Sequence, residues 1–332
     1  TSGNAVLFVI DAQNGTLTRK LDTGSGTNNG LSGPAAIDTN GDGVVDLVYA
    51  GDLNGNLWKF DLTSSDESLW AVGNGGGALY AAGTTKPITS APDVTRHPKG
   101  GYLISFGTGR YIDENDNTNN NAQSMYAVWD NLTNGTVTQG QLQQQAILDT
   151  TTSGGIAFRL SSHKIGTPVD SLVTGDTPTI DRETFLTTQR GWFVNLPTTG
   201  ERVVADVAFR SGRLIAVSMI PGTDCDAANG SGWLMEFDAI TGNRLDVVTF
   251  DINGNGVLTP ALLGDYLAFS ISGAAGSNVS GRKIDGIPAG QTTVTKGVLE
   301  DRLISTSKGT VEQVTAGRGA GRDGRAMWRE VR

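Results

Sequence analysis

Short apolar runs alternate along the chain with turns rich in glycine, asparagine and aspartate. One unit recurs: an apolar run, an aspartate, a turn with glycine, and a second run. It appears at residues 6–17, 51–62 and 232–245, with turns at Asn14-Gly15, Asn54-Gly55 and Thr241-Gly242. Asn-Gly and Thr-Gly after an apolar run favour hairpins, because such turns need positive φ angles. The pattern therefore predicts antiparallel strands joined by tight turns.

Weaker copies of the unit occupy residues 101–111 with 125–130, 213–218 and 302–314. Repeated hairpins of this kind predict an all-β fold, a modified β-propeller built of four-stranded antiparallel blades with polar loop insertions. We count about five blade-like units over residues 1–332. The insertions are residues 113–121 and 135–145, and the second is expected to hold a short helix. Whether the ring closes stays open.

Composition agrees with this fold. Glycine accounts for 46 of 332 residues and charged residues for 18%, which suits short strands and turns better than long helices. The net charge of −9 argues against a nucleic-acid partner. Cys225 is the only cysteine, so no disulfide can form within the chain. No apolar segment is long enough to span a membrane, and the chain opens in a strand, as expected of a piece of a longer polypeptide.

The most informative motif is a calcium-type loop at residues 38–46. Oxygen-bearing side chains occupy loop positions 1, 3, 5 and 9, namely Asp38, Asn40, Asp42 and Asp46. Gly43 stands at position 6, where the loop turns sharply, and Val44 stands at position 7, which supplies a carbonyl oxygen. Position 12 is Tyr49 instead of the usual glutamate, and an apolar run follows at once. The loop is therefore expected between β-strands.

Charge decides between two interpretations of this loop. Asx hydrogen bonds alone can hold a polar turn. However, Asp38, Asp42 and Asp46 place three carboxylates within nine residues, and these would repel one another without a cation. We therefore predict a Ca²⁺ site with Asp38, Asn40, Asp42, Asp46 and the Val44 carbonyl as ligands.

Other candidate sites are weaker. Residues 251–256 echo the loop, but Asp251 is the only carboxylate among positions 1, 3 and 5, and position 9 is Thr259, so an ordinary turn is favoured. Asp113, Glu114 and Asp116 are interpreted as a solvated loop.

Catalytic and nucleotide-binding motifs are also weak. The two histidines, His97 and His163, stand in unrelated loops, which argues against a His-based metal site or a catalytic triad. The glycines of residues 73–77 are not followed by Lys-Ser/Thr, so a flexible turn is favoured over a phosphate loop. The arginines of residues 318–332 alternate with glycine and are interpreted as part of a surface strand.

Several stretches together resemble the C-terminal propeller of the PilY/PilC-type proteins of type IV pilus biogenesis and tip adhesion. These stretches occur in the same order as in that family. They are Gly24-Ser-Gly26 and Gly30-Leu-Ser before the loop, Tyr49 to Leu62 after it, Phe106 to Tyr111 with Tyr126 to Asp130, Gly191 to Pro197 with Gly200 to Val204, and Arg325 to Glu330. Each stretch alone is weak, but the combination is specific.

The resemblance implies a modified β-propeller whose loop binds calcium through the ligands named above. It implies a secreted parent protein at the bacterial surface, at the pilus tip or in the outer membrane or periplasm. That protein would promote pilus extension and twitching motility by opposing retraction, and would support adhesion. Implied partners are minor pilins or other pilus components and a host-cell receptor. The family has earlier blades than those present here, so an arc with an exposed edge is expected.

Two other classes of protein compete with this hypothesis. Quinoprotein dehydrogenases are propellers whose repeats read Asp-Ala-x-x-Gly-x-x-x-Trp, but the repeats at Asp11 and Asp238 lack the closing tryptophan. An absorbance scan for bound quinone would detect such a cofactor. Integrin-like propellers carry calcium loops in several blades, whereas this chain has one good loop, and metal stoichiometry would separate the two. We expect no enzyme activity.

Overall fold

The computed structural model describes residues 3–167, 173, 175–222, 229–260, 264–271 and 276–318. Strands dominate this part of the chain, which confirms the predicted all-β class. Its single α-helix is α1 (Arg182–Thr188), and short 3₁₀ turns cover Glu67–Leu69, Asn74–Gly76, Glu114–Thr118 and Gln139–Gln141. No helix in these ranges is long and apolar enough to cross a membrane.

Four larger sheets follow an N-terminal hairpin of β1 (Val6–Ile10) and β2 (Leu17–Asp22), and each is named here after one strand. The β3 sheet has the order β3 (Ala35–Ile37), β4 (Leu47–Gly51), β5 (Asn56–Asp61) and β6 (Ala71–Val72), with β7 (Tyr80–Ala81) also paired to β5. The β8 sheet has the order β11 (Gln143–Gln145), β14 (Gly191–Asn195), β10 (Ser124–Asp130), β9 (Tyr102–Gly107) and β8 (Asp93–Arg96).

The other two larger sheets come from the second half of the chain. The β15 sheet has the order β12 (Ile147–Ser153), β13 (Ile156–Ser161), β20 (Gly281–Asp285), β17 (Ser231–Asp238), β16 (Arg213–Ile220) and β15 (Ala208–Arg210). The β21 sheet has the order β21 (Pro288–Lys296), β22 (Leu299–Thr306) and β23 (Val311–Gly317), and a small pair is formed by β18 (Tyr266–Leu267) and β19 (Ser277–Asn278). Neighbouring strands are antiparallel except β11 and β14, which are parallel.

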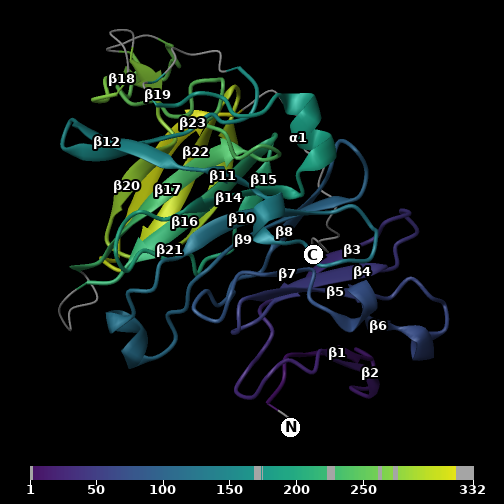
Figure 1. Cartoon of the computed structure of the whole chain (residues 1–332). Coiled ribbons are helices and arrows are strands. Elements are labelled where there is room, and N and C mark those ends of the chain that lie inside the picture. Colours follow the sequence, from purple (N-terminus) through teal and green to yellow (C-terminus); the bar gives the residue numbers. More distant parts are fainter. Residues whose placement is uncertain are drawn as a thin grey trace.

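The four larger sheets meet at a common hollow of about 510 Å³. Its lining comes from the start of each sheet, with Pro34 just before β3, Asp93 on β8, Ala208 on β15 and Thr292 on β21. Figure 1 shows the sheets in succession from the β1–β2 hairpin to β21–β23. Sheets that radiate from a shared axis are the blades of a propeller, so the predicted modified β-propeller is confirmed.

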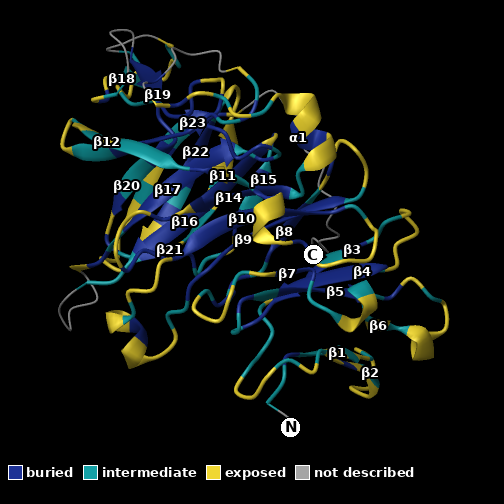
Figure 2. Cartoon of the chain, viewed as in Figure 1, coloured by how far each residue is buried: buried dark blue, intermediate teal, exposed yellow. Residues whose placement is uncertain are grey.

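Apolar side chains fill the spaces between successive sheets. Tyr49 and Ile104 belong to the cluster between the β3 and β8 sheets, and Trp192 and Phe237 to the cluster between the β8 and β15 sheets. All seven residues of β10 are buried, and Figure 2 shows the central strands buried while the connecting loops are exposed. Burial on both faces explains why these strands read as continuous apolar runs and not as alternating ones.

One insertion differs from its prediction. Asp113 and Glu114 are exposed, as expected of a solvated loop, but Asp116 is buried. Its carboxylate accepts 2.8 Å and 2.9 Å hydrogen bonds from Arg110 Nε and the Ile112 backbone N–H. The solvated interpretation is therefore wrong for Asp116, because a buried carboxylate is stable where charged and backbone donors satisfy it.

Candidate metal site

The loop of residues 38–46 joins β3 to β4, as its flanking runs predict. The Asp46 backbone N–H donates to the Ile37 carbonyl over 2.8 Å and closes the hairpin at its base. Gly41 and Gly43 have φ angles of 83° and 87°, a region in which residues with a side chain are strained. The glycines therefore allow the backbone to curl between the two strands.

Side-chain oxygens stabilise this backbone conformation by accepting hydrogen bonds from backbone N–H groups of the loop. The Asp38 carboxylate accepts hydrogen bonds from the backbone N–H groups of Gly41 and Gly43 over 2.6 Å and 2.8 Å. Asn40 Oδ1 accepts from the Asp42 N–H over 2.9 Å, and Asp42 Oδ1 accepts from the Val44 N–H over 2.8 Å. Successive Asx turns thus wrap the backbone around the oxygens at positions 1, 3 and 5.

Asp46 ties the end of the loop to its beginning. Its side chain is buried, and Oδ2 accepts hydrogen bonds from the Thr39 N–H over 2.8 Å and from Thr39 Oγ1 over 2.5 Å. Within the described ranges no hydrogen bond reaches Asp46 Oδ1 or Asp42 Oδ2. Each of these two carboxylates therefore keeps one oxygen that a ligand could use.

The negative charge of the loop is not neutralised by any basic side chain that the structure describes. Among the described residues, no Lys, Arg or His forms an ion pair with Asp38, Asp42 or Asp46. The backbone hydrogen bond from Gly43, with further ones from the loop, lowers the pKa of Asp38 below its ordinary value. Asp38 therefore stays ionised through mildly acidic pH.

The part of the chain that is described holds no group of three or more Asp, Glu, His or Cys side chains arranged to hold a metal. The carboxylates of Asp38, Asp42 and Asp46 thus lie in one loop without converging on one point. Their donor atoms are all oxygens, which are the ligands that hard cations such as Ca²⁺ prefer. The residues fit such an ion chemically, and Ca²⁺ would have to draw the carboxylates together.

The loop at residues 251–256 repeats these hydrogen bonds. Asp251 accepts from the backbone N–H groups of Gly254 and Gly256 over 2.8 Å and 2.9 Å, as Asp38 does from Gly41 and Gly43. The amides of Asn253 and Asn255 accept from the N–H groups of Asn255 and Val257 over 3.0 Å and 2.8 Å. This loop is therefore a wrapped Asx loop like the first.

Asp265 takes the place of Asp46 in the second loop. It is fully buried and accepts hydrogen bonds from the N–H groups of Ile252 and Thr259 over 2.8 Å and 2.6 Å. Sequence reasoning missed Asp265, because position 9 is Thr259 and the acidic residue lies further along the chain. Since the same bonds form around fewer carboxylates, loop geometry alone does not identify a metal site. The three carboxylates of residues 38–46 distinguish the first loop.

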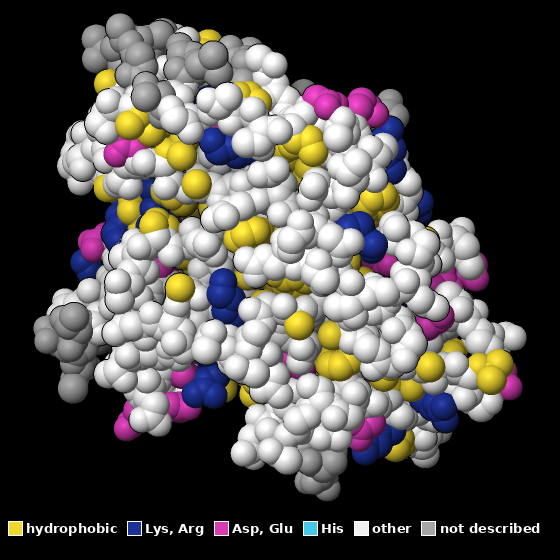
Figure 3. Space-filling view, viewed as in Figure 1, with side chains coloured by type: hydrophobic (Ala, Val, Ile, Leu, Met, Phe, Trp, Pro, Cys, Tyr) yellow, Lys and Arg dark blue, Asp and Glu magenta, His cyan; other side chains and the backbone are white. Residues whose placement is uncertain are grey.

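The remaining candidates have structural partners. His97 stacks on Trp129 with ring centroids 4.0 Å apart, and His163 is buried beside Asn243 and Asp246. Asn74, in the glycine-rich segment, accepts a hydrogen bond from the Gly135 N–H, so that segment forms a supported turn. Cys225 and residues 319–332 lie outside the described residues. In Figure 3 the Lys and Arg side chains on the visible face are scattered and not gathered into one patch.

Antiparallel blades around a shared hollow, with an aspartate-rich loop between two strands of one blade, define a modified β-propeller. Residues 1–157 match the family model described as the PilY1 beta-propeller domain. The solved C-terminal domain of Pseudomonas aeruginosa PilY1 is similar to this chain with a TM-score of 0.72 and 29% identity, over 96% of this chain and 68% of that domain. The chain belongs to the PilY1 β-propeller family, which confirms the predicted resemblance.

Curated relatives agree. The type IV pilus biogenesis factor PilY1 of Pseudomonas aeruginosa strain PAO1 is 35% identical over 294 residues, which cover 76% of this chain and 24% of that protein. A PilY1 homologue of Xylella fastidiosa is 32% identical over 268 residues, which cover 73% of this chain and 17% of that protein. The chain thus spans about a quarter or less of these relatives. They are named for pilus biogenesis and not for a reaction.

Proposed function

We propose that this chain is a calcium-binding, non-catalytic module of a type IV pilus biogenesis factor. The observation that carries the proposal is the loop of residues 38–46, in which three carboxylates have no basic partner among the described residues. Asp38, Asn40, Asp42, Asp46 and the Val44 carbonyl would hold Ca²⁺, and water would complete the shell where position 12 lacks a carboxylate. The ion would replace repulsion among the carboxylates with attraction to a common charge.

Calcium would act by fixing the shape of the loop. The Val44 side chain is 60% exposed at the tip of the loop, so a partner could contact it directly. A partner that recognises the ion-bound shape would bind more weakly once calcium is removed. We propose minor pilins or other pilus components as such partners, and a host-cell receptor as a further one.

The proposed role of the parent protein is supported by the names of the relatives, which are type IV pilus biogenesis factors. We propose that it is secreted, acts at the cell surface, at the pilus tip or in the outer membrane or periplasm, and promotes pilus extension by opposing retraction. Twitching motility and adhesion would depend on it. Catalysis is not part of the proposal, because both histidines are held in structural contacts.

The experiment compares two variants of the parent protein in the bacterium that encodes it. Asp42→Ala removes one carboxylate from the proposed site, and Asp251→Ala makes the same change in the second loop. We expect fewer surface pili and less twitching with Asp42→Ala and near-normal values with Asp251→Ala, at equal protein levels. Equal pilus numbers in both strains would overturn the calcium-dependent role.

A pull-down separates a regulatory role of calcium from a structural one. The intact parent protein is used to recover minor pilins in buffer with calcium and in buffer with a chelator. Recovery that falls with the chelator supports a calcium-set surface. Equal recovery in both buffers would overturn the regulatory part of the proposal.

A further inference from the structure

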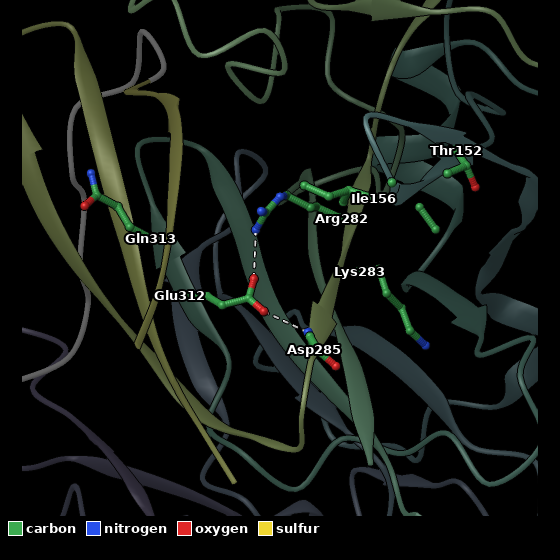
Figure 4. Close-up of a pocket in the computed structure, with 9 residues that line it drawn as sticks. Thr152, Ile156, Arg282, Lys283, Asp285, Glu312 and Gln313 are labelled. Atoms are coloured by element: carbon green, nitrogen blue, oxygen red, sulfur yellow. Dashed lines mark hydrogen bonds and ion pairs between the residues drawn. The ribbon is translucent and has the colours of Figure 1, made fainter. Parts of the chain in front are cut away.

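A hollow of about 520 Å³ lies at the outer part of the β15 sheet, next to β23 of the neighbouring sheet. It arises from a break in strand pairing. β13 pairs with β20 at Phe158 with Arg282 and at Arg159 with Gly281, and the pairing ends there. Beyond that point the β12–β13 hairpin and the end of β20 diverge, and the hollow opens between them and β23 (Figure 4).

Most charges around this hollow are already neutralised. Arg282 forms a 3.1 Å ion pair with Glu312, which also accepts a 2.8 Å hydrogen bond from the Asp285 backbone N–H. The Asp285 carboxylate forms a 2.7 Å ion pair with Lys308 on the surface. Lys283 is the one remaining charged residue of the lining.

Lys283 forms no ion pair with an acidic side chain among the described residues. Its side chain is partly buried, and Figure 4 shows that it points away from the Arg282–Glu312 pair. Its ammonium lies 5.1 Å from the centre of the Trp233 ring. The nearby Arg159 is already neutralised by Glu201, whose two oxygens accept from its guanidinium over 2.7 Å and 2.8 Å. Burial, and secondly the charge of Arg159, lower the pKa of Lys283, and the charge of Glu201 offsets part of this shift.

Two further donors next to Lys283 lack acceptors. The indole N–H of Trp233 and the Nε–H of Arg159 are buried, and neither donates a hydrogen bond to a group in the described parts of the chain. Both belong to the same cluster, because the Arg159 guanidinium carbon lies 3.8 Å from the centre of the Trp233 ring. Buried donors normally find acceptors. The Lys283 ammonium and these two N–H groups therefore share one cluster at the Trp233 ring, and Lys283 is the member of this cluster that lines the hollow.

We infer that this hollow binds a carboxylate, with the ammonium of Lys283 as its anchor. The site is distinct from the calcium loop and does not depend on the proposed pilus function. One unpaired cation matches the single charge of a carboxylate better than the double charge of phosphate, which proteins bind with several donors and usually arginine. The volume is sufficient for a small organic acid or for an acidic side chain or C-terminus of a partner peptide.

The test uses nuclear magnetic resonance of tryptophan indole N–H groups in the folded chain. The Trp233 signal is assigned as the one lost in Trp233→Phe. Sodium acetate, an acetylated peptide with a C-terminal glutamate, and inorganic phosphate are added separately at constant ionic strength. We expect acetate to shift the Trp233 signal in a saturable manner, and Lys283→Met to weaken this binding at least about tenfold. Lys20→Met, which removes a paired surface lysine outside the lining of the hollow, should leave it unchanged.

The outcomes are distinct. Tighter binding of the peptide than of acetate would identify a protein segment as the source of the carboxylate, and equal binding would identify a free acid. Phosphate that binds as well as acetate would overturn the preference for a carboxylate. The absence of any saturable shift in the unmodified chain, or equal binding by a Lys283→Met variant with an unchanged circular dichroism spectrum, would overturn the site itself.

Discussion

Trp58 donates its indole N–H to Oδ2 of Asp52 over 2.8 Å, and this bond joins the two strands of the Asn54-Gly55 hairpin. Asp52 is fully buried. Its other oxygen accepts from the backbone N–H groups of Asn54 and Asn56 over 2.9 Å and 2.8 Å. The aspartate before the turn therefore accepts the hydrogen bonds that hold the turn and the second strand in place. This explains why an aspartate precedes the turn in the recurring sequence unit.

Asp52→Ala should lower the free energy of unfolding by about 3 kcal/mol or more, because several buried donors would lose their acceptor at once. Asp61→Ala is the matched control. Asp61 is only partly buried and bonds locally to Thr63, so we expect a loss below about 1 kcal/mol. Urea unfolding of both variants gives the comparison, and similar losses would show that Asp52 is not the centre of the hairpin.

Asp42→Ala should abolish calcium binding while the fold remains largely β. Asp42 supplies a carboxylate to the loop, whereas the sheets are held by the clusters between them. Calorimetry on chelator-treated protein is expected to show no heat of binding for the variant at millimolar Ca²⁺. Its far-ultraviolet circular dichroism should match that of the unmodified chain, and a spectrum of unfolded protein would mean that the loop is needed for folding.

The chain should bind one Ca²⁺, with a dissociation constant of about 10⁻⁶ to 10⁻³ M, since no carboxylate stands at position 12. The second loop has the same hydrogen bonds but fewer carboxylates, so Asp251→Ala should leave both the stoichiometry and the affinity unchanged. Metal analysis after equilibrium dialysis checks the number of ions. Two ions per chain, falling to one in Asp251→Ala, would contradict this prediction.

His97 should make the fold less stable in mild acid. Burial, with a smaller effect from Lys99, lowers the pKa of His97 from 6.5 to about 4. The unfolded chain therefore binds more protons between these values, so stability falls as the pH drops from about 7 towards 4. The loss between pH 7 and pH 5 should be about 2 kcal/mol.

His97→Phe should remove this part of the pH dependence, because phenylalanine can keep the stack on Trp129 without titrating. Chemical unfolding of both proteins at pH 7 and pH 5 checks the effect. If both lose the same stability on acidification, His97 does not titrate as proposed.

The fold class was predictable because the central strands are buried on both faces and their turns need glycine or asparagine, so local sequence carries the signal. The Thr241-Gly242 turn shows a role of glycine that local sequence does not predict. A Cβ atom on Gly242 would lie 2.3 Å from the Trp192 ring, so the glycine also makes room for a side chain from the neighbouring sheet. Turn chemistry predicts the glycine, but only the packing of sheets reveals its second role.

Charged residues were harder to interpret from sequence. The loop of residues 38–46 was recognisable because its spacing is local, and the structure places it between two strands as predicted. Asp265 was not recognisable because it lies six positions after Thr259, outside the spacing of the loop. The burial of Asp116 was not recognisable because a distant segment packs against it. Arg202, for example, donates to the Asp116 carbonyl over 2.6 Å from 86 positions further along the chain. The isolation of Lys283 likewise depends on where β13 leaves β20.

The path of the chain between β10 and β14 binds two blades together. After β10 the chain adds β11 to the β8 sheet and the β12–β13 hairpin to the β15 sheet, and then returns to form β14. β14 lies between β10 and β11 in the β8 sheet, and the chain forms it only after it has contributed β12 and β13 to the next blade. The chain itself therefore links the two blades, so under a stretching force applied across residues 124–195 we expect them to give way in one long step instead of two.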